Sequence, residues 1–263
     1  MKLWVKIALA TVTTAGVGAG VWYLFNRNKK PKTLKIQLVR SNLSGVFDRV
    51  IIKIPATTLA FYKDSERQSI RNRMAEIKSM YGAVISNTAN LIGIPEAIIY
   101  SFIFIESRGE KTAQNGLSYG LMQVSTNSAT DILHLANKGG HVTGDVKTIL
   151  RKHLGSRLDT ILKMQYMNQY GLQVTESDLI KPELNILIGT LYLRLLIDYF
   201  TENKRIRLDK VVACYNMGFG WRTKLMQPNY DTIEKTIANL NSTTSSYILK
   251  LLGKNGTLDI LTQ

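Results

Sequence analysis

Ile98 to Ser107 reads Ile-Ile-Tyr-Ser-Phe-Ile-Phe-Ile-Glu-Ser, and this stretch decides the fold. Pro95 lies just upstream, and because proline is tolerated in the first turn of a helix, we expect a helix to begin there. Apolar side chains occupy every face of that helix up to Ile105, which is typical of a helix buried inside a protein. The carboxyl group of Glu106 therefore stands at the end of a buried helix.

A carboxyl group in this position is expected to hold its proton more tightly than usual. Burial disfavours the charged form of Glu106, and the negative end of the helix dipole disfavours it again. Both effects raise the pKa toward neutral pH, where a general acid needs it. A glutamate at the end of a helix is more often only a solvated residue, so the interpretation depends on the sequence around it.

Three further segments follow Glu106 in the chain and complete a pattern. A short polar strip comes 11 residues after Ser107, an apolar segment with one asparagine follows much later, and a third segment contains the sequence Tyr-Asn. They are Ser118–Gln123 (SYGLMQ), Asn185–Leu193 (NILIGTLYL) and Ala213–Gly218 (ACYNMG).

Together these segments resemble the catalytic domain of the soluble lytic transglycosylase family. The family's Glu-Ser pair falls on Glu106-Ser107, its GLMQ motif on Gly120–Gln123, its N-I-x-x-G-x-x-Y-L helix on Asn185–Leu193, and its A-Y-N-x-G motif on Ala213–Gly218. Cys214 stands between the alanine and tyrosine of the last motif, as a variant of the usual Ala-Ala-Tyr-Asn. The resemblance covers residues 94–221 and implies a mainly α, lysozyme-like fold of the goose type.

The resemblance also implies an activity. Members of the family cleave the β-1,4 bond between N-acetylmuramic acid and N-acetylglucosamine in peptidoglycan without water, and they leave a 1,6-anhydro ring. Glu106 would be the sole general acid and base, with no metal and no organic cofactor. Ser107 would hydrogen-bond to Glu106 and orient it.

The resemblance implies further contacts with the glycan. Gln123 would contact N-acetyl or peptide groups, Met122 would form an apolar floor or pack in the core, and Tyr119 would stack on a sugar or pack. Tyr215 would lie across the cleft from Glu106 with its hydroxyl aimed at the reacting sugar. Asn216 would hold its loop or bind sugar. The structural positions of the pattern would be Asn185, Gly189 and Tyr192.

Two other activities stay open at this stage. The first is a muramidase-type hydrolase of the same fold, which needs a second carboxylate to activate water. The candidates for that role are Glu110, Glu176 and Glu183. The second is a non-catalytic wall-binding protein of a virion or a secretion apparatus, although retention of Glu106 and the Tyr215-Asn216 pair argues against it.

Residues 7–25 form an uncharged run flanked by lysines before it and by arginine and lysines after it. A helix of this length spans about 28 Å, close to the hydrocarbon thickness of a bilayer. The run ends in bulky side chains and not in a small-residue cleavage site, so an uncleaved anchor within residues 1–30 is favoured over a signal peptide. The orientation stays open, as does the choice between a bacterial inner membrane and a lipid-containing phage virion, where other membrane or virion proteins would be partners.

The rest of the chain divides into two parts. Residues 31–63 are a short segment rich in β-branched residues, and two strands are expected at Lys35–Val39 and Val46–Ile54. They would pack on the main domain or pair with another chain. Residues 64–263 have helical periodicity and form the predicted transglycosylase domain, which we expect to be all-α. Within it, Asp145 to Met167 is expected to be helical.

About 60 residues separate Gln123 from Asn185, more than the family usually has. The extra segment, residues 131–177, would be a solvated helical insertion or a basic wall of the substrate groove. Its basic residues are Lys138, Lys147, Arg151, Lys152, Arg157 and Lys163.

Composition adds limits but no activity. The net charge of +15 would attract polyanions, yet nucleic-acid binding would rest on charge alone. Cys214 is the only cysteine, which excludes an intrachain disulfide. The three histidines lack the spacing of a zinc site, so no metal is expected.

Overall fold

The computed structural model describes residues 21–24, 34–38, 50–54, 59–202 and 205–261. The order of its main elements is β1 (Val21–Leu24), β2 (Leu34–Leu38), β3 (Val50–Ile54), α1 (Arg67–Ile92), α2 (Glu96–Ser107), β4 (Gln114–Asn115), β5 (Ser118–Tyr119), β6 (Val124–Ser125), α3 (Thr126–Lys138), α4 (Gly144–Leu154), α5 (Arg157–Lys163), α6 (Glu176–Leu179), α7 (Pro182–Tyr199), β7 (Thr201–Glu202), β8 (Arg205–Ile206), α8 (Leu208–Met217), α9 (Ile233–Asn239), α10 (Ser242–Leu252) and α11 (Thr257–Leu261). Short 3₁₀ turns lie at Asp64–Glu66, Phe219–Trp221, Lys224–Met226 and Pro228–Tyr230.

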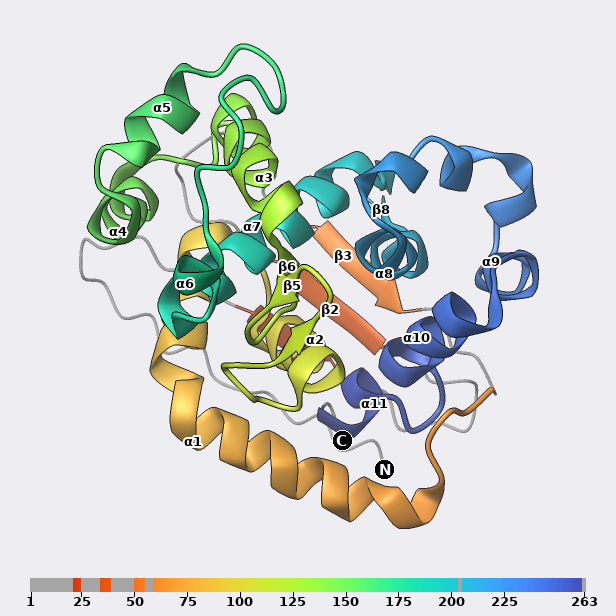
Figure 1. The fold of residues 1–263 in the computed structure, drawn as a ribbon. Coiled ribbons are helices and arrows are strands. Elements are labelled where there is room, and N and C mark those ends of the chain that lie inside the picture. Colours follow the sequence, from red (N-terminus) through yellow and green to blue (C-terminus); the bar gives the residue numbers. More distant parts are fainter. Residues whose placement is uncertain (1–20, 25–33, 39–49, 55–58, 203–204, 262–263) are drawn as a thin grey trace.

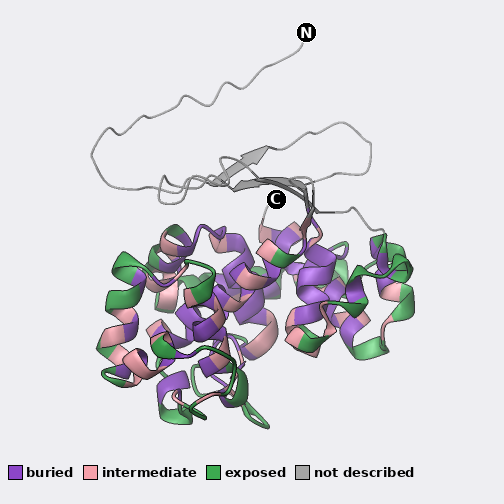
Figure 2. Ribbon diagram, turned by 90° about the horizontal axis from the view of Figure 1, so that it is seen from above, coloured by how far each residue is buried: buried purple, intermediate pink, exposed green. Residues whose placement is uncertain are grey.

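The described part of the chain is mainly helical, as the sequence predicts. Helices α2 and α7 form its centre, and their apolar residues are almost all buried on every face. Helix α7 packs against α1, α3 and α8, while α10 packs against α8 and α2 (Figure 1). Buried residues gather along the inner faces of the helices and exposed residues lie outside (Figure 2). One shared core therefore positions the segments of the sequence pattern.

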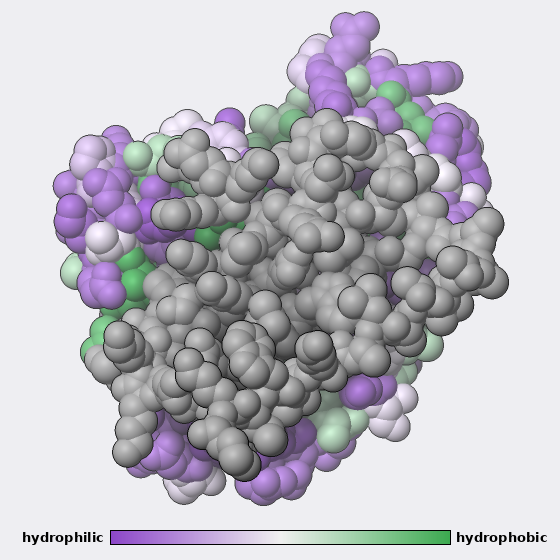
Figure 3. Space-filling view, turned by 180° about the vertical axis from the view of Figure 1, so that it is seen from behind, coloured by the Kyte–Doolittle hydropathy of each residue, from purple (hydrophilic) through white to green (hydrophobic). Residues whose placement is uncertain are grey.

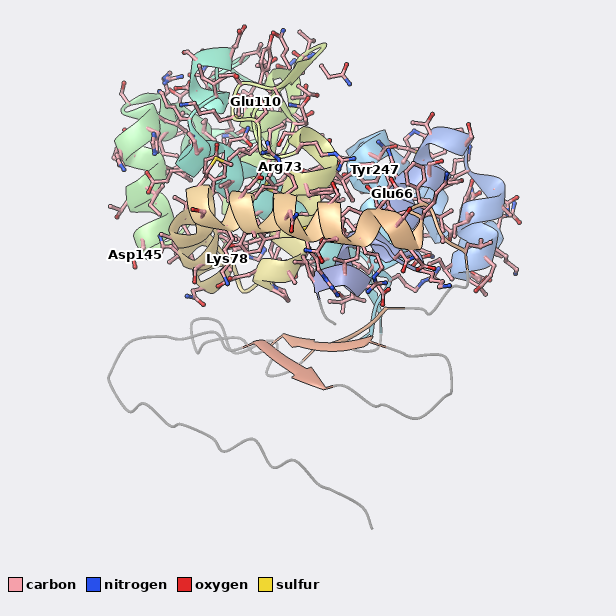
Figure 4. The ribbon with its side chains drawn as sticks, turned by 90° about the horizontal axis from the view of Figure 1, so that it is seen from below. Glu66, Arg73, Lys78, Glu110, Asp145 and Tyr247 are labelled. Carbon is pink, nitrogen blue, oxygen red and sulfur yellow. The ribbon has the colours of Figure 1, made fainter. Side chains whose placement is uncertain are left out.

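The strands predicted at Lys35–Val39 and Val46–Ile54 are confirmed where the structure describes them, as β2 and β3, and they join the main domain. Val39 and residues 46–49 lie outside the described residues. Strand β2 pairs antiparallel with β3, and β3 pairs in parallel with β8 through Ile51 and Arg205. The resulting sheet has the order β1-β2-β3-β8-β7. It lies on one side of the helices, as Figure 4 shows. On the face seen from behind, the described side chains at the rim are mainly hydrophilic, with apolar ones among them (Figure 3).

The predicted membrane span does not match the structure where the two can be compared. Its residues 7–20 and Phe25 lie outside the described residues, and the remaining four, Val21–Leu24, form strand β1 and not a helix. The sequence Val-Trp-Tyr-Leu favours a strand because β-branched and aromatic residues suit a pleated surface. Among the described residues, no helix has both the length and the hydropathy needed to cross a bilayer.

Two other expectations need correction. The domain is not all-α, because the polar strip folds into a small antiparallel sheet of order β4-β5-β6. Glycines in the left-handed region, Gly116 and Gly120, permit its tight turns. In addition, the helix expected from Asp145 to Met167 is two helices, since Gly155 ends α4 with φ 57° and ψ −134°.

Candidate active site

Glu106 lies in the last turn of α2, where the sequence places it. The helix ends at Ser107, and Arg108 follows in the left-handed conformation with φ 54°. The Arg108 backbone N–H closes the last turn with a 3.1 Å hydrogen bond to the carbonyl of Phe104. Glu106 as a whole residue is half-buried, and its carboxyl group is packed by protein.

The surroundings of Glu106 favour its protonated form. Burial raises the pKa of Glu106 to about 7, although a hydrogen bond from Tyr247 and the positive charge of Lys250 both act to lower it. The expected rise is thus confirmed, and its main cause is the expected one. A carboxyl group with this pKa can donate a proton near neutral pH and take one back.

Tyr247, on α10, donates a hydrogen bond from its hydroxyl to Oε1 of Glu106. The pKa of Tyr247 is raised well above its ordinary value by burial and by the charge of Glu106, so the phenol stays a donor. Sequence reasoning missed this residue, because Tyr247 shares an apolar helix face with Ile248 and Leu251 and looks like an ordinary core tyrosine.

Ser107 has a different role from the predicted one. Its hydroxyl lies 2.8 Å from the carbonyl oxygen of Leu121 and 3.1 Å from that of Ile103, and it accepts a 3.1 Å hydrogen bond from the N–H of Gly109. The expected bond to the Glu106 carboxyl is replaced by these contacts, since the Ser107 side chain points toward the backbone of the next segment. Ser107 therefore ties the end of α2 to the GLMQ segment, Gly120–Gln123.

Asn185 organises the GLMQ segment from the other side. Its Oδ1 accepts a 2.8 Å hydrogen bond from the N–H of Met122, and its Nδ2 donates to the carbonyls of Tyr119 (2.8 Å) and Leu179 (2.9 Å). Gly120 is required beside it, because a Cβ there would stand 2.5 Å from Asn185 Nδ2 and 2.3 Å from the Leu179 carbonyl. The structural role predicted for Asn185 has this geometric basis.

Met122 packs in the core and does not line a surface. Its side chain is fully buried, and Thr190 Oγ1 lies 3.8 Å from its Sδ. A Cβ on Gly189 would stand 2.7 Å from both Cβ and Sδ of Met122. Asn185 and Gly189 are four residues apart, so one face of α7 holds the GLMQ segment. Of the two roles left open for Met122, packing in the core matches this buried contact with α7 better than an apolar floor.

Gln123 and Tyr119 shape the small sheet. Gln123 is half-buried with φ 46°, and its Nε2 donates 2.9 Å hydrogen bonds to the carbonyls of Ala113 and Gly120. The ring of Tyr119 is mostly buried, and its hydroxyl accepts a 3.1 Å hydrogen bond from Gln114 Nε2. Of the two roles left open for Tyr119, packing matches this burial better than stacking on a sugar. The contact predicted between Gln123 and a glycan stays a prediction.

Tyr215 lies close to Glu106, but its hydroxyl is already engaged. It donates a 2.8 Å hydrogen bond to the Met122 carbonyl, and its ring packs against Phe102 at 4.7 Å and Tyr192 at 5.0 Å between centroids. Burial, followed by the charge of Glu106, raises the pKa of Tyr215 well above the ordinary value. The hydroxyl predicted to aim at a sugar instead ties α8 to the GLMQ segment.

Asn216 follows on the exposed side of α8. Its Oδ1 accepts a 2.9 Å hydrogen bond from Thr244 Oγ1 at the start of α10. The role of holding the local structure is therefore supported for Asn216, and the role of binding sugar stays a prediction. The bond joins the helix of Tyr215 to the helix of Tyr247.

The three carboxylates considered as water activators are exposed or engaged with other groups. Glu110 accepts hydrogen bonds from Thr112 N and Oγ1, which lower its pKa. Glu183 contacts Lys152 Nζ at 2.6 Å and His153 Nε2 at 2.8 Å, and Glu176 is exposed at the start of α6.

Three of the six basic residues named for the insertion pair with acids. Arg151 bonds to Asp159, Arg157 bonds to the buried Asp178, and Lys152 bonds to Glu183. These contacts hold α4, α5 and α6 against each other and against the start of α7. The arrangement favours the solvated helical insertion over the basic wall.

Comparison with known proteins gives one match. The family model described as Transglycosylase SLT domain matches residues 161–238, a range that contains Asn185, Tyr215 and Asn216 but neither Glu106 nor Tyr247. No curated protein matches the chain. The match supports an SLT-family lysozyme-like domain. Since members of that family are lytic transglycosylases, it also supports, in general terms, an enzyme that cleaves peptidoglycan.

Proposed function

We propose that this protein is a peptidoglycan lytic transglycosylase in which Glu106 is the sole general acid and base. The observation that carries the proposal is the carboxyl group of Glu106 at the end of a buried helix. Its pKa is raised to about 7, and it accepts a hydrogen bond from the Tyr247 hydroxyl. The SLT match at residues 161–238 supports the substrate class independently of that carboxyl group.

In the proposed reaction, Glu106 first protonates the glycosidic oxygen between N-acetylmuramic acid and N-acetylglucosamine. The bond from C1 to that oxygen breaks, and N-acetylglucosamine leaves as an alcohol. The C6 hydroxyl of the muramic residue then attacks C1 and gives its proton to the Glu106 carboxylate. One carboxyl group thus serves both steps, no water is consumed, and the proton that was donated is recovered.

Two features support a lyase over a hydrolase of the same fold. A hydrolase needs a second carboxylate about 5–9.5 Å from the first. Glu110 is directed toward Thr112, and Glu183 is directed toward Lys152 and His153. Glu176 is exposed at the start of α6. The Tyr247 hydroxyl, in contrast, is placed to stabilise the Glu106 carboxylate in the interval between donating and accepting the proton.

The product tests the proposal. The full chain would digest purified sacculi, and mass spectrometry would examine the muropeptides. We expect 1,6-anhydro-N-acetylmuramic ends, lighter by one water than hydrolytic ends and resistant to borohydride. The matched control is Glu106→Gln, which keeps the shape of the side chain and removes its acidic proton. This variant should release no muropeptides. Reducible ends would identify a hydrolase, and no release by the wild type at any pH would point to the wall-binding alternative.

The cellular location is proposed from the sequence alone. Residues 7–25 would hold the chain in a bilayer with the catalytic domain facing the wall, in a bacterial inner membrane or a lipid-containing virion. In that state residues 21–24 would leave strand β1, because they cannot lie in a membrane helix and in the sheet at once. Carbonate washing of membrane fractions and sequencing of the mature N-terminus would test this. Release into the soluble fraction would contradict it.

A further inference from the structure

Arg222, which follows the 3₁₀ turn Phe219–Trp221, is held by aromatic rings and not by an acid. Its guanidinium carbon lies 4.1 Å from the centre of the Phe219 ring and 5.8 Å from that of Tyr199, and its Nη1 donates a 3.0 Å hydrogen bond to the Phe219 carbonyl. In the described part of the chain no carboxylate forms an ion pair with it. A guanidinium has five N–H donors, so most of them stay available to a ligand.

Lys224 adds a second cation of the same kind. Its Nζ lies 4.3 Å from the centre of the Trp221 ring, and its side chain is exposed. No ion pair links it to a carboxylate of the described residues. Residues 211–230 contain no aspartate and no glutamate. Residues 222–224, which we call the basic turn, therefore carry positive charge that their own segment does not neutralise.

Ring contacts connect the basic turn to the helix of the active-site carboxyl group. The Phe219 ring lies 6.4 Å from the Tyr192 ring between centroids, and Tyr192 lies 5.0 Å from Tyr215. Tyr215 packs at 4.7 Å against Phe102, which stands on α2 one turn before Glu106. The basic turn is thus three ring contacts away from the helix that carries Glu106.

The proposed substrate carries carboxylates within this range. A stem peptide of about four residues spans at most about 13–14 Å when it is extended. It begins on the muramic acid whose glycosidic bond would be cleaved, and it has free carboxylates along its length and at its end. Arginine suits such a group, because its planar fork can donate two parallel hydrogen bonds to a carboxylate while its face stays on a ring.

We propose that Arg222, assisted by Lys224, binds a carboxylate of the stem peptide and so directs the enzyme to glycan that bears peptides. The lactyl carboxyl of muramic acid is consumed in the amide bond to the peptide, so intact glycan strands do not supply this negative charge themselves. The inference rests on the proposed function in taking peptidoglycan as the substrate.

The test uses variants of the full chain on three substrates. Arg222→Gln and Lys224→Gln each remove one charge, Arg222→Lys keeps the charge without the fork, and Lys78→Gln is the matched control, since Lys78 is exposed on α1. The substrates are intact sacculi, sacculi whose carboxylates have been converted to amides with carbodiimide and ammonia, and strands freed of stem peptides by an amidase. The rate at which anhydro ends form would be measured at limiting substrate.

Binding would be measured separately from cleavage. The same variants, made in the Glu106→Gln background, would be sedimented with intact and with amidated sacculi to give a Kd. On intact sacculi Arg222→Gln should raise the Kd and lower the cleavage rate by about three- to tenfold, the range expected for a charge-assisted hydrogen bond at a partly exposed site. Lys224→Gln should have an effect of about twofold, because its charge is more exposed.

The controls should separate the carboxylate contact from other effects. Arg222→Lys should recover part of the loss, and Lys78→Gln should match the wild type on every substrate. On amidated sacculi and on peptide-free strands, Arg222→Gln should match the wild type, because the group that Arg222 binds has been removed. The difference between intact and amidated sacculi is the decisive readout, since a purely structural role of Arg222 would not change it.

A loss of the same size on intact and on amidated sacculi would overturn the proposal, because Arg222 would then only stabilise its turn. A loss that persists on peptide-free strands, whose carboxylates are the lactyl groups, would overturn the assignment to the stem peptide. If the Kd depends on Arg222 as expected but no anhydro ends form, the proposed function fails and the inference stands. If Arg222→Gln forms anhydro ends at the wild-type rate, the inference fails and the function stands.

Discussion

The hydroxyl of Tyr247 donates a hydrogen bond to the carboxyl group of Glu106, which lies 141 residues earlier in the chain. The contact joins the last turn of α2 to the middle of α10 across the site. It places a neutral hydrogen-bond donor beside a carboxyl group whose pKa is about 7. The same hydroxyl can contact both the protonated carboxyl group and its conjugate base.

The first prediction concerns Glu106→Gln. Its activity should fall by at least about a thousandfold, because the amide cannot donate the proton. The free energy of unfolding of the variant should exceed that of the wild type at alkaline pH. The folded state keeps the Glu106 proton up to about pH 7 whereas the unfolded chain loses it near pH 4.5, so ionisation costs stability progressively between these values. The full cost, about 3 kcal/mol, is present above pH 7.

Urea unfolding of wild type and Glu106→Gln at pH 4 and pH 8 would measure this cost. The variant should exceed the wild type at pH 8 and match it at pH 4. Glu110→Gln is the control, since Glu110 is exposed and its pKa is lowered, so it should gain nothing at pH 8. Equal stability of wild type and Glu106→Gln at both pH values would show that the carboxyl is not held in its protonated form.

The second prediction concerns Tyr247→Phe. The loss of its hydrogen bond removes a group that lowers the pKa of Glu106, so the alkaline limb of activity should move to higher pH. The turnover rate should fall by about tenfold or more, because a hydrogen bond to a charged group contributes about 1.5–3 kcal/mol. Tyr100→Phe is the control, since Tyr100 is a buried tyrosine on α2 whose hydroxyl has no partner among the described residues. A Tyr247→Phe enzyme with the wild-type pH profile would contradict the role.

The third prediction concerns Asn185→Ala. Three hydrogen bonds from one buried side chain hold the backbone at Tyr119, Met122 and Leu179, and their loss leaves these polar groups unpaired. We expect destabilisation of about 3 kcal/mol or more, measured by urea unfolding, together with loss of activity. Asn239→Ala is the control, because Asn239 is exposed. A small effect at Asn185 would mean that the GLMQ segment is held by its own turns.

The fourth prediction concerns Gly189→Ala. In a helix interior this change alone would stabilise by about 1 kcal/mol. At Gly189 the new Cβ would collide with Met122, whose carbonyl holds the Tyr215 hydroxyl. We therefore expect a net loss of about 1–3 kcal/mol in thermal or urea unfolding. Gly220→Ala, where nothing lies within 4 Å of the added Cβ, should be neutral. A stabilised Gly189→Ala would show that Met122 moves aside freely.

The sequence by itself determined the helical class of the main domain and the position of Glu106. The helical class follows from the helical periodicity of residues 64–263. The position of Glu106 follows because a run that is apolar on every face can lie only inside a core, and the residue that ends the run is then placed there too. Two of the three described strands before residue 55, β2 and β3, were also readable, because β-branched residues cluster there. Asn185 and Gly189 stood out through the resemblance to the transglycosylase family, and their spacing of four residues puts them on one face of a helix.

Tertiary structure alone decided what each of these residues touches. Tyr247 reaches Glu106 only because α10 packs on α2, and its own segment looks like any amphipathic helix. Ser107 and Tyr215 bond to backbone carbonyls of the GLMQ segment, and a motif cannot show such partners because every residue has a carbonyl. Local sequence fixes which face of a helix is buried, but long-range packing chooses the partner, and the chemistry of the site depends on that partner.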